Sequence, residues 1–193
     1  MIVQPETGDI CLLRFVLDAR ARADLDATLG EGAAFGPVVR ALANVLRAHR
    51  DAWLSAGAVD AESGRLFEVP DRLRLLVDAE RDTLRALDDR ARGLDDGPFR
   101  GGTLGDDSAV LVVIAIGIRE SPQLRQVGRT TLVTIGAIAR GHTLVSALDA
   151  IAELADGDIL GGEILVRPER GRELALHELS RAYSRDELVA VKV

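Results

Sequence analysis

Apolar residues along this chain occur in two patterns: short continuous runs, and longer stretches in which they recur every three or four positions. Short runs are typical of buried strands, and the three-to-four spacing is typical of helices with one buried face. We predict strands at residues 10–17, 110–116, 164–166 and 188–193. Residues 53–55 are either a further short strand or the end of a helix.

Helices are predicted between these strands, and residues 71–94 show the clearest pattern. Apolar residues recur there at threes and fours, while the other positions carry mixed charges that are typical of a solvated face. Shorter helices are predicted at residues 19–29, 143–154 and 172–183, and in the stretch whose first turn holds Pro37. Residues 60–64 are expected to form a turn, and residues 124–139 fit either a strand or a helix.

This order of elements predicts one compact α/β or α+β domain, in which helices cover a mixed sheet of four or five strands. With 193 residues, the chain is long enough to form one sizeable core. The alternative is two lobes, residues 1–93 and 106–193, joined by the glycine-rich segment 94–105. Aromatic residues are only 3% of the chain, so we expect a core of aliphatic side chains.

The charge of the chain argues against a nucleic-acid partner. The formal net charge is −7, and acidic and basic residues are interleaved along the chain. Nucleic-acid binders usually carry a basic field, because the release of counterions from phosphates supplies much of their affinity. We therefore expect no nucleic-acid partner.

The sequence predicts a soluble protein of the cytoplasm with no transmembrane segment. The longest apolar stretch, residues 109–118, is about half the length that a membrane-spanning helix needs. The N-terminal residues lack the charged start and apolar stretch of a signal peptide. Cys11 is the only cysteine, so the chain can form no internal disulfide, and we expect this thiol to be a buried core residue.

No motif in the chain points to a specific chemistry. The glycine-rich residues 97–105 follow a predicted helix, precede a strand and contain no lysine, which is the wrong context for a phosphate loop. His49, His142 and His177 lie in three separate elements and lack the spacing of a zinc site. We therefore expect no metal, no cofactor and no catalytic residue, although enzymatic activity stays open.

One cluster suggests a surface for a partner: His49, Arg50, Asp51 and Trp53. It combines the only tryptophan with a titratable ring and a charge pair at the end of a helix. Tryptophan and arginine are typical anchors of protein interfaces, so this cluster is our candidate interaction site. The alternative is that Trp53 fills the core while its neighbours cap the helix.

Two parts of the chain share features with a known family. Residues 38–53 hold a predicted helix that ends near Arg47 and His49, and then Trp53. Residues 111–116, 148–154, 159–168 and 174–188 follow the order strand, helix, strand and closing helix. Together they resemble the uncharacterised cyanobacterial and plastid domain-of-unknown-function family "fifteen-seventeen". The resemblance implies a fold and no reaction, and it adds peripheral attachment to a membrane protein as a further functional alternative.

These observations favour a non-enzymatic protein-interaction or regulatory domain, which acts as a homo-oligomer or with a protein partner. The alternative is a small-molecule-binding domain, or an enzyme whose site is assembled only in the fold. A deep pocket lined by His49, His142 or His177 would favour the alternative. A flat apolar patch on the helix at residues 71–94 would favour the interaction domain.

Overall fold

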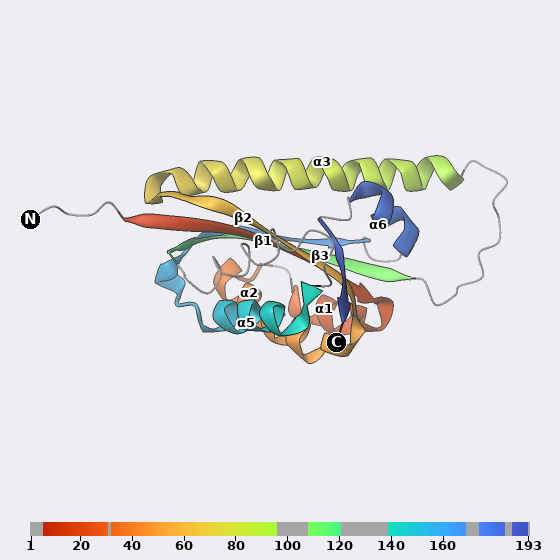
Figure 1. The fold of residues 1–193 in the computed structure, drawn as a ribbon, viewed down its shortest axis with the longest axis horizontal. Coiled ribbons are helices and arrows are strands. Elements are labelled where there is room, and N and C mark those ends of the chain that lie inside the picture. Colours follow the sequence, from red (N-terminus) through yellow and green to blue (C-terminus); the bar gives the residue numbers. More distant parts are fainter. Residues whose placement is uncertain are drawn as a thin grey trace, which may run out of the picture.

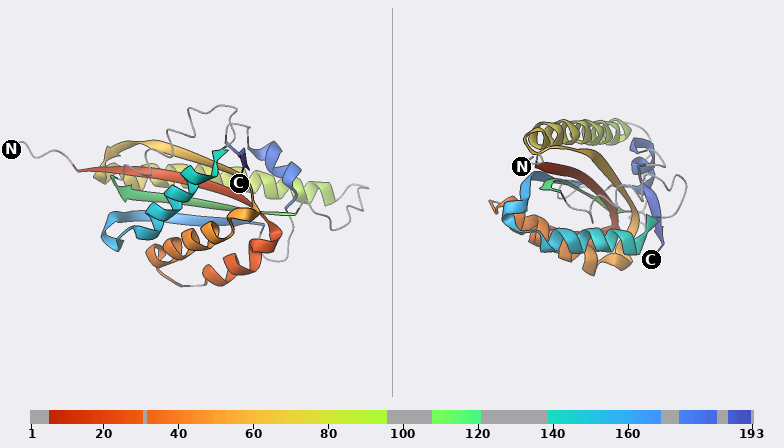
Figure 2. Two further views of the ribbon diagram at one scale, coloured as in Figure 1. Left: turned by 60° about the horizontal axis from the view of Figure 1, so that its bottom comes forward. Right: turned by 60° about the vertical axis from the view of Figure 1, so that its left-hand side comes forward.

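A computed structural model describes residues 6–30, 32–95, 108–120, 139–168, 174–183 and 187–192 of the chain. A single twisted sheet forms the middle layer, and helices cover both of its faces (Figure 1). The end-on view in Figure 2 shows the same three layers of helix, sheet and helix. The α+β class predicted from the sequence is confirmed.

The sheet has the strand order β4-β6-β2-β1-β3-β5. The strands are β1 (Thr7–Asp18), β2 (Trp53–Arg65), β3 (Ala109–Arg119), β4 (Ala139–Arg140), β5 (Ile159–Arg167) and β6 (Val189–Lys192). The four predicted strands are present, and residues 53–55 begin a strand rather than end a helix. These five strands pair with one another in antiparallel orientation. The two-residue strand β4 adds a parallel pairing with β6, so the sheet is mixed, as predicted.

The helices divide between the two faces of the sheet (Figure 1). One face is covered by α1 (Arg22–Thr28), α2 (Phe35–Ala48) and α5 (Gly141–Glu153), and the other by α3 (Val69–Asp95) and α6 (Leu176–Ala182). Short 3-10 turns join several elements: Ala19–Ala21, Arg50–Ala52, Leu66–Glu68 and Asp156–Asp158. No helix among the described residues combines the length and apolar character that crossing a bilayer requires.

Strand β1 lies between β2 and β3, and its sequence is apolar because both of its faces are buried. Alternate residues of a strand point to opposite faces. Cys11, Leu13, Phe15 and Leu17 pack toward α2 and α5, so the expected burial of Cys11 is confirmed. The other alternate set packs toward α3 and α6 and consists of Ile10, Leu12 and Val16.

The predicted turn at residues 60–64 is wrong, because β2 continues to Arg65. The segment pairs with β1 in a defined register, from Gly64 opposite Gly8 to Asp60 opposite Cys11, with an irregularity after Gly8. Pairing with a neighbouring strand therefore outweighs the local preference of an Asp-, Ser- and Gly-containing segment for a turn.

Strands from both halves of the sequence belong to the same sheet. β1 pairs with β3 continuously, from Gly8 opposite Arg119 to Asp18 opposite Ala109. Most of the glycine-rich segment at 94–105 lies outside the described residues, as does nearly all of the ambiguous segment at 124–139. The sheet nevertheless shows that the two flanking halves pack together around a common central strand.

Candidate functional site

One charged side chain interrupts the apolar face that β1 turns toward α3. Arg14 is only 5% exposed and lies opposite Gly57 in β2. Its guanidinium donates two parallel hydrogen bonds to Glu80 of α3, from Nε to Oε1 at 3.0 Å and from Nη2 to Oε2 at 2.6 Å. A buried charge is tolerated only when it is paired and hydrogen-bonded, and this forked geometry meets that requirement.

Tyr183, at the end of α6, completes the cluster. Its hydroxyl donates to Glu80 Oε1 at 2.6 Å, and the centre of its ring lies 4.9 Å from Arg14 Cζ. Burial raises the pKa of Tyr183 well above its usual range, and the negative charge of Glu80 raises it further. The hydroxyl is therefore held in its protonated form, which is the form that can donate to Glu80.

The same environment keeps Arg14 charged. Burial alone would lower the pKa of Arg14, but the hydrogen bonds and the charge of Glu80 outweigh it and leave this pKa raised. Glu80 receives three hydrogen bonds, two from Arg14 and one from Tyr183. These three side chains connect β1, α3 and α6, so we call them the buried polar cluster.

Gly57 makes room for the chain that follows α6. A Cβ atom placed on Gly57 would lie 1.8 Å from the carbonyl oxygen of Glu187, which is far inside any real contact. The main chain at Glu187 therefore passes directly over β2, beside the position of Arg14. The C-terminal part of the described chain is thus fixed at two neighbouring points, through Tyr183 and over Gly57.

Arg14 also retains one unused donor. Its Nη1 atom is buried and has no hydrogen-bond acceptor among the described residues. Buried polar groups in proteins are nearly always paired, so an unpaired guanidinium nitrogen is the one feature of the buried polar cluster that could receive a small ligand or a water molecule.

The buried polar cluster was not predicted, although two of its members stand out in the sequence. Arg14 is the one charged residue in an otherwise apolar run. Glu80 follows Val77 by three positions and precedes Leu84 by four, which is the spacing of the buried face of α3. A charge at a position predicted to be buried was the available signal for an ion pair in the core.

Three members of the predicted interaction cluster lie at or near the surface. His49 ends α2, and its Nε2 lies 2.7 Å from Asp24 Oδ2. Arg20 Nη2 donates to the carbonyl oxygen of Asp51 at 3.0 Å and to its carboxylate oxygen Oδ2 at 3.2 Å. Arg50 is half-buried. These contacts join the end of α2 to the segment around α1.

Trp53 does not share that surface. Its side chain is in the core, with the residue only 3% exposed, and its Nε1 donates to the carbonyl oxygen of Leu46 at 3.0 Å. Its ring packs against Phe15 with 5.1 Å between the ring centres. Trp53 therefore fills the core, as the alternative interpretation has it, and the interaction site at this cluster stays a prediction.

The histidines do not form a common site among the described residues. His49 ends α2 on one face of the sheet, whereas His177 is in α6 on the other face (Figure 1). The side chain of His142 lies outside the description. In the part of the chain whose side chains are described, no three His, Cys, Asp or Glu residues are grouped as metal ligands.

The outer face of α3 is charged rather than apolar. Its ion pairs at three-residue spacing are Arg74–Asp71, Arg81–Asp78 and Arg85–Asp82. Among its described side chains, Leu75 is the large apolar residue that is exposed, at 67%. The flat apolar patch that would mark this helix as an interaction surface is therefore not present between residues 71 and 88.

Strand β5 is the long strand at one end of the sheet. It pairs with β3 from Ile118 opposite Ile159 to Leu111 opposite Arg167. No strand in the described ranges pairs with its outer edge. Every residue of β5 is partly exposed, including its apolar ones: Ile159, Leu160, Ile164, Leu165 and Val166.

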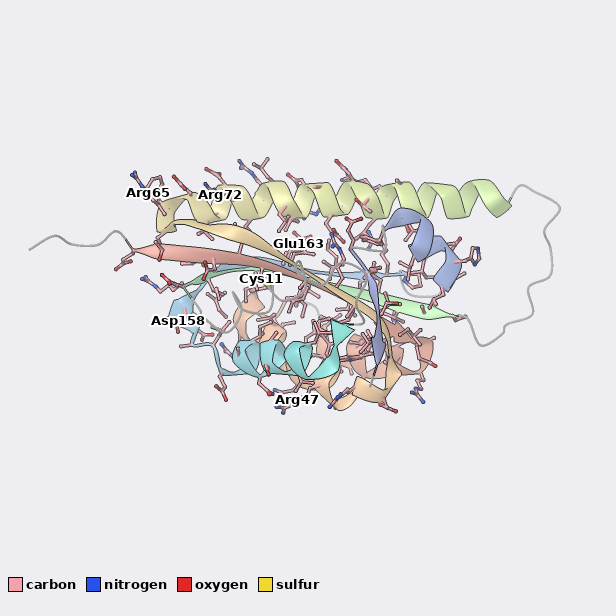
Figure 3. The ribbon with its side chains drawn as sticks, in the orientation of Figure 1. Cys11, Arg47, Arg65, Arg72, Asp158 and Glu163 are labelled. Carbon is pink, nitrogen blue, oxygen red and sulfur yellow. The ribbon has the colours of Figure 1, made fainter. Side chains whose placement is uncertain are left out.

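Two charged residues of β5 are held by α3. Arg81 donates three hydrogen bonds to the Glu163 carboxylate, at 2.7, 2.8 and 3.1 Å, and Glu163 lies beneath α3 (Figure 3). Four residues along the strand, Arg167 Nε lies 3.4 Å from Asp88 Oδ2. The first contact is a well-formed pair, whereas the second is too long for a good hydrogen bond and leaves Arg167 Nε without an acceptor.

No family model matches the sequence, and no curated protein or solved structure is significantly similar to it. The resemblance to the domain-of-unknown-function family "fifteen-seventeen" stays a prediction.

Replacing Tyr183 with phenylalanine tests the hydrogen bond to Glu80 while keeping the ring beside Arg14. We expect Tyr183→Phe to lower the free energy of unfolding by about 1.5–3 kcal/mol, because the hydroxyl donates to a charged group. Denaturant titration at neutral pH measures this loss. An unchanged free energy of unfolding would mean that the hydroxyl contributes nothing to the cluster.

The stabilities of the wild type and Tyr183→Phe should also depend differently on pH. Because the pKa of Tyr183 is raised in the folded state, the unfolded chain releases this proton first, from about pH 10. The contribution of the hydroxyl is therefore complete below about pH 10 and declines as the pH rises further. The difference in stability between the wild type and Tyr183→Phe should shrink above that pH.

Proposed function

We propose that this chain is a non-enzymatic protein-interaction or regulatory domain that binds a protein partner along the outer edge of β5. The observation that carries this proposal is a nine-residue strand with partly exposed side chains at the end of the sheet. An unpaired strand edge presents a row of free N–H and C=O groups that a second strand can pair with.

The composition of β5 supports this role. Proteins that must not associate usually protect an edge strand with lysines, a proline inside the strand or a very short length. β5 has nine residues and no lysine, and Pro168 follows its last residue. Its pairing with β3 is regular except for one irregularity between Gly117 and Ile118, at the start of the strand. Its two charged residues, Glu163 and Arg167, are drawn toward α3 rather than projecting alone from the edge.

The opposite end of the sheet differs. There the last strand in the described ranges is β4, which pairs with β6 through Ala139 and Arg140. This described pairing is short and offers few groups to a partner, so we take β5 as the better of the two edges. The partner is a protein rather than a nucleic acid, and the cytoplasmic location expected from the sequence is part of this proposal.

A second candidate function is the binding of a small ligand beside Arg14. The buried Nη1 atom without an acceptor favours it, because an anion or a hydrogen-bonding group would satisfy that donor. The negative charge of Glu80, at hydrogen-bond distance from the same guanidinium, disfavours an anion and makes this the weaker candidate.

Native mass spectrometry of the purified chain at several concentrations tests the two candidates together. We expect a dimer or higher oligomer that carries no adduct. Ile164→Lys, which places a charge in the middle of β5, should shift the protein to the monomer. Leu75→Lys introduces the same charge at an exposed apolar position of α3 and should leave the oligomeric state unchanged.

Three outcomes contradict the proposal. A monomer with a stoichiometric adduct would favour the small-ligand alternative. A monomer without adduct at every concentration would remove the support for self-association at β5. An oligomer that persists in Ile164→Lys, with its circular dichroism spectrum intact, would place the interface elsewhere. The wild-type masses decide the first two cases even if Ile164→Lys does not fold.

A further inference from the structure

We infer that the partner at β5 is a second copy of this chain, bound antiparallel about a two-fold axis that passes midway between the Leu165 residues of the two copies. This inference rests on the proposed function of the β5 edge and specifies its occupant and register. It follows from the spacing of two opposite charges on β5 and from the contacts that each of them makes with α3.

The geometry of a sheet limits the registers that two copies of β5 can adopt. Residues directly opposite each other in neighbouring strands point to the same face of the sheet. A two-fold axis perpendicular to the sheet keeps α3 of both copies on the same side. From residue 163 to residue 167, the odd-numbered residues of β5 point to that side in both copies, so they must lie opposite odd-numbered residues of the partner. The axis therefore passes midway between one residue and its own copy, and the choice of that residue fixes all the other pairs; below, the axis is named by this residue.

The charges on β5 select among these registers. With the axis at Glu163, the two Glu163 carboxylates face each other, and like charges directly opposite are destabilising. With the axis at Leu165, Glu163 lies opposite Arg167 of the partner subunit, and this pairing occurs twice. Opposite charges are favourable across neighbouring strands, so the second register is preferred.

The side chains that would make these contacts remain accessible. The Glu163 side chain is 31% exposed, and the Arg167 side chain is 22% exposed. A carboxylate has about four lone-pair sites, and from the described residues the Glu163 carboxylate receives three hydrogen bonds, all from Arg81. Glu163 can therefore accept a further donor without losing its contact with α3.

Arg167 is the side chain with the poorer contact in the single chain. Among the described residues, the carboxylate that it contacts is that of Asp88, at 3.4 Å, and its Nη1 donates to the carbonyl of the preceding residue, Val166. In the proposed dimer each Arg167 lies between Asp88 of its own chain and the partner's Glu163. The charges then alternate in a row: Arg81, Glu163, the partner's Arg167 and the partner's Asp88.

The apolar residues fit the same register. Leu165 faces the partner's Leu165 on the axis, and Ile164 faces the partner's Val166 on the other face of the sheet. Pairing ends one step outward, where Gly162 would lie opposite Pro168 of the partner subunit, because proline has no N–H to donate. The paired segment is short, from residue 163 to residue 167, and we therefore expect a dimer that dissociates on dilution.

Cysteine crosslinking measures this register directly. The native Cys11 is buried in the core, which leaves introduced thiols as the reactive ones. Leu165→Cys places two thiols opposite each other on the axis, within the separation that a disulfide spans. Ile159→Cys is the matched control on the same strand, because its twin lies far away in this register.

At concentrations where the wild type is dimeric, we expect mild oxidation to convert most of Leu165→Cys to a covalent dimer. Ile159→Cys should stay largely uncrosslinked. No crosslinking of Leu165→Cys, although Ile164→Lys abolishes the dimer, would overturn the register and leave the β5 proposal intact. A dimer that persists in Ile164→Lys would overturn the β5 proposal itself.

Discussion

Glu80→Ala should lower the free energy of unfolding by about 3–5 kcal/mol, the largest effect that we expect from a single substitution. The substitution leaves the Arg14 guanidinium buried, charged and without its carboxylate, and it also removes the acceptor of the Tyr183 hydroxyl. The cost arises from an uncompensated charge rather than from the small cavity alone. Urea titration followed by circular dichroism measures the loss.

A control on the same helix separates this effect from a general weakening of α3. Asp82 pairs with Arg85 on the exposed face, and both side chains are mostly in solvent. Asp82→Ala should therefore change the free energy of unfolding by less than about 0.5 kcal/mol. Comparable losses in the two variants would show that the buried pair has no special role.

A triple variant tests the reason for the loss. Replacing Arg14, Glu80 and Tyr183 together with Met, Leu and Phe removes all three polar groups and keeps similar volumes. Buried ion pairs replaced in this way are often neutral or stabilising, so we expect a free energy of unfolding within about 1 kcal/mol of the wild type or above it. A loss as large as that of Glu80→Ala would contradict the explanation.

Gly57→Ala should lower the free energy of unfolding by about 1–3 kcal/mol, which is typical of overpacking at a closely packed position. The added methyl group would meet the carbonyl oxygen of Glu187, and main chain cannot swing aside as the end of a long side chain can. We expect residues 187–192 to move away from β2, which weakens the pairing of Ser55 with Ala190. Hydrogen exchange should then be faster in the amides of β6.

Gly30→Ala is the matched control for Gly57→Ala. Nothing lies within 4 Å of a Cβ atom at Gly30, and its φ is not in the left-handed region. This substitution should change stability by no more than about 0.5 kcal/mol and leave exchange in β6 unaltered. If the β6 amides of Gly57→Ala exchanged as slowly as those of the wild type, the C-terminal segment would not depend on the close approach of Glu187 to Gly57.

The elements that the sequence predicted well are those with a strong local pattern. Strand β1 is a continuous apolar run, and α3 repeats its apolar residues at helical spacing along its whole length. The extent of β2 was missed because its second half is polar and small, and only its pairing with β1 keeps it extended. The predicted turn failed because the partner strand lies about fifty residues earlier in the sequence.

The buried polar cluster could not be predicted for the same physical reason. Arg14 and Glu80 are 66 residues apart, and Glu80 and Tyr183 are 103 residues apart. A sequence pattern reveals that Glu80 is on the buried face of α3, but it does not reveal which buried cation lies opposite. For Trp53 the residue type suggested an interface anchor, but tryptophan is equally typical of a core, so the sequence did not decide between the two.

The order of the buried polar cluster along the chain has a consequence for synthesis. A ribosome releases Arg14 first, Glu80 next and Tyr183 last, so the central strand carries its positive charge for most of translation before the full set of partners exists. Burying Arg14 early is costly, because an unpaired guanidinium loses its hydration. The face of the sheet beneath α3 can close at low cost only after Glu80 has emerged, and α6 can be fixed there only once Tyr183 follows.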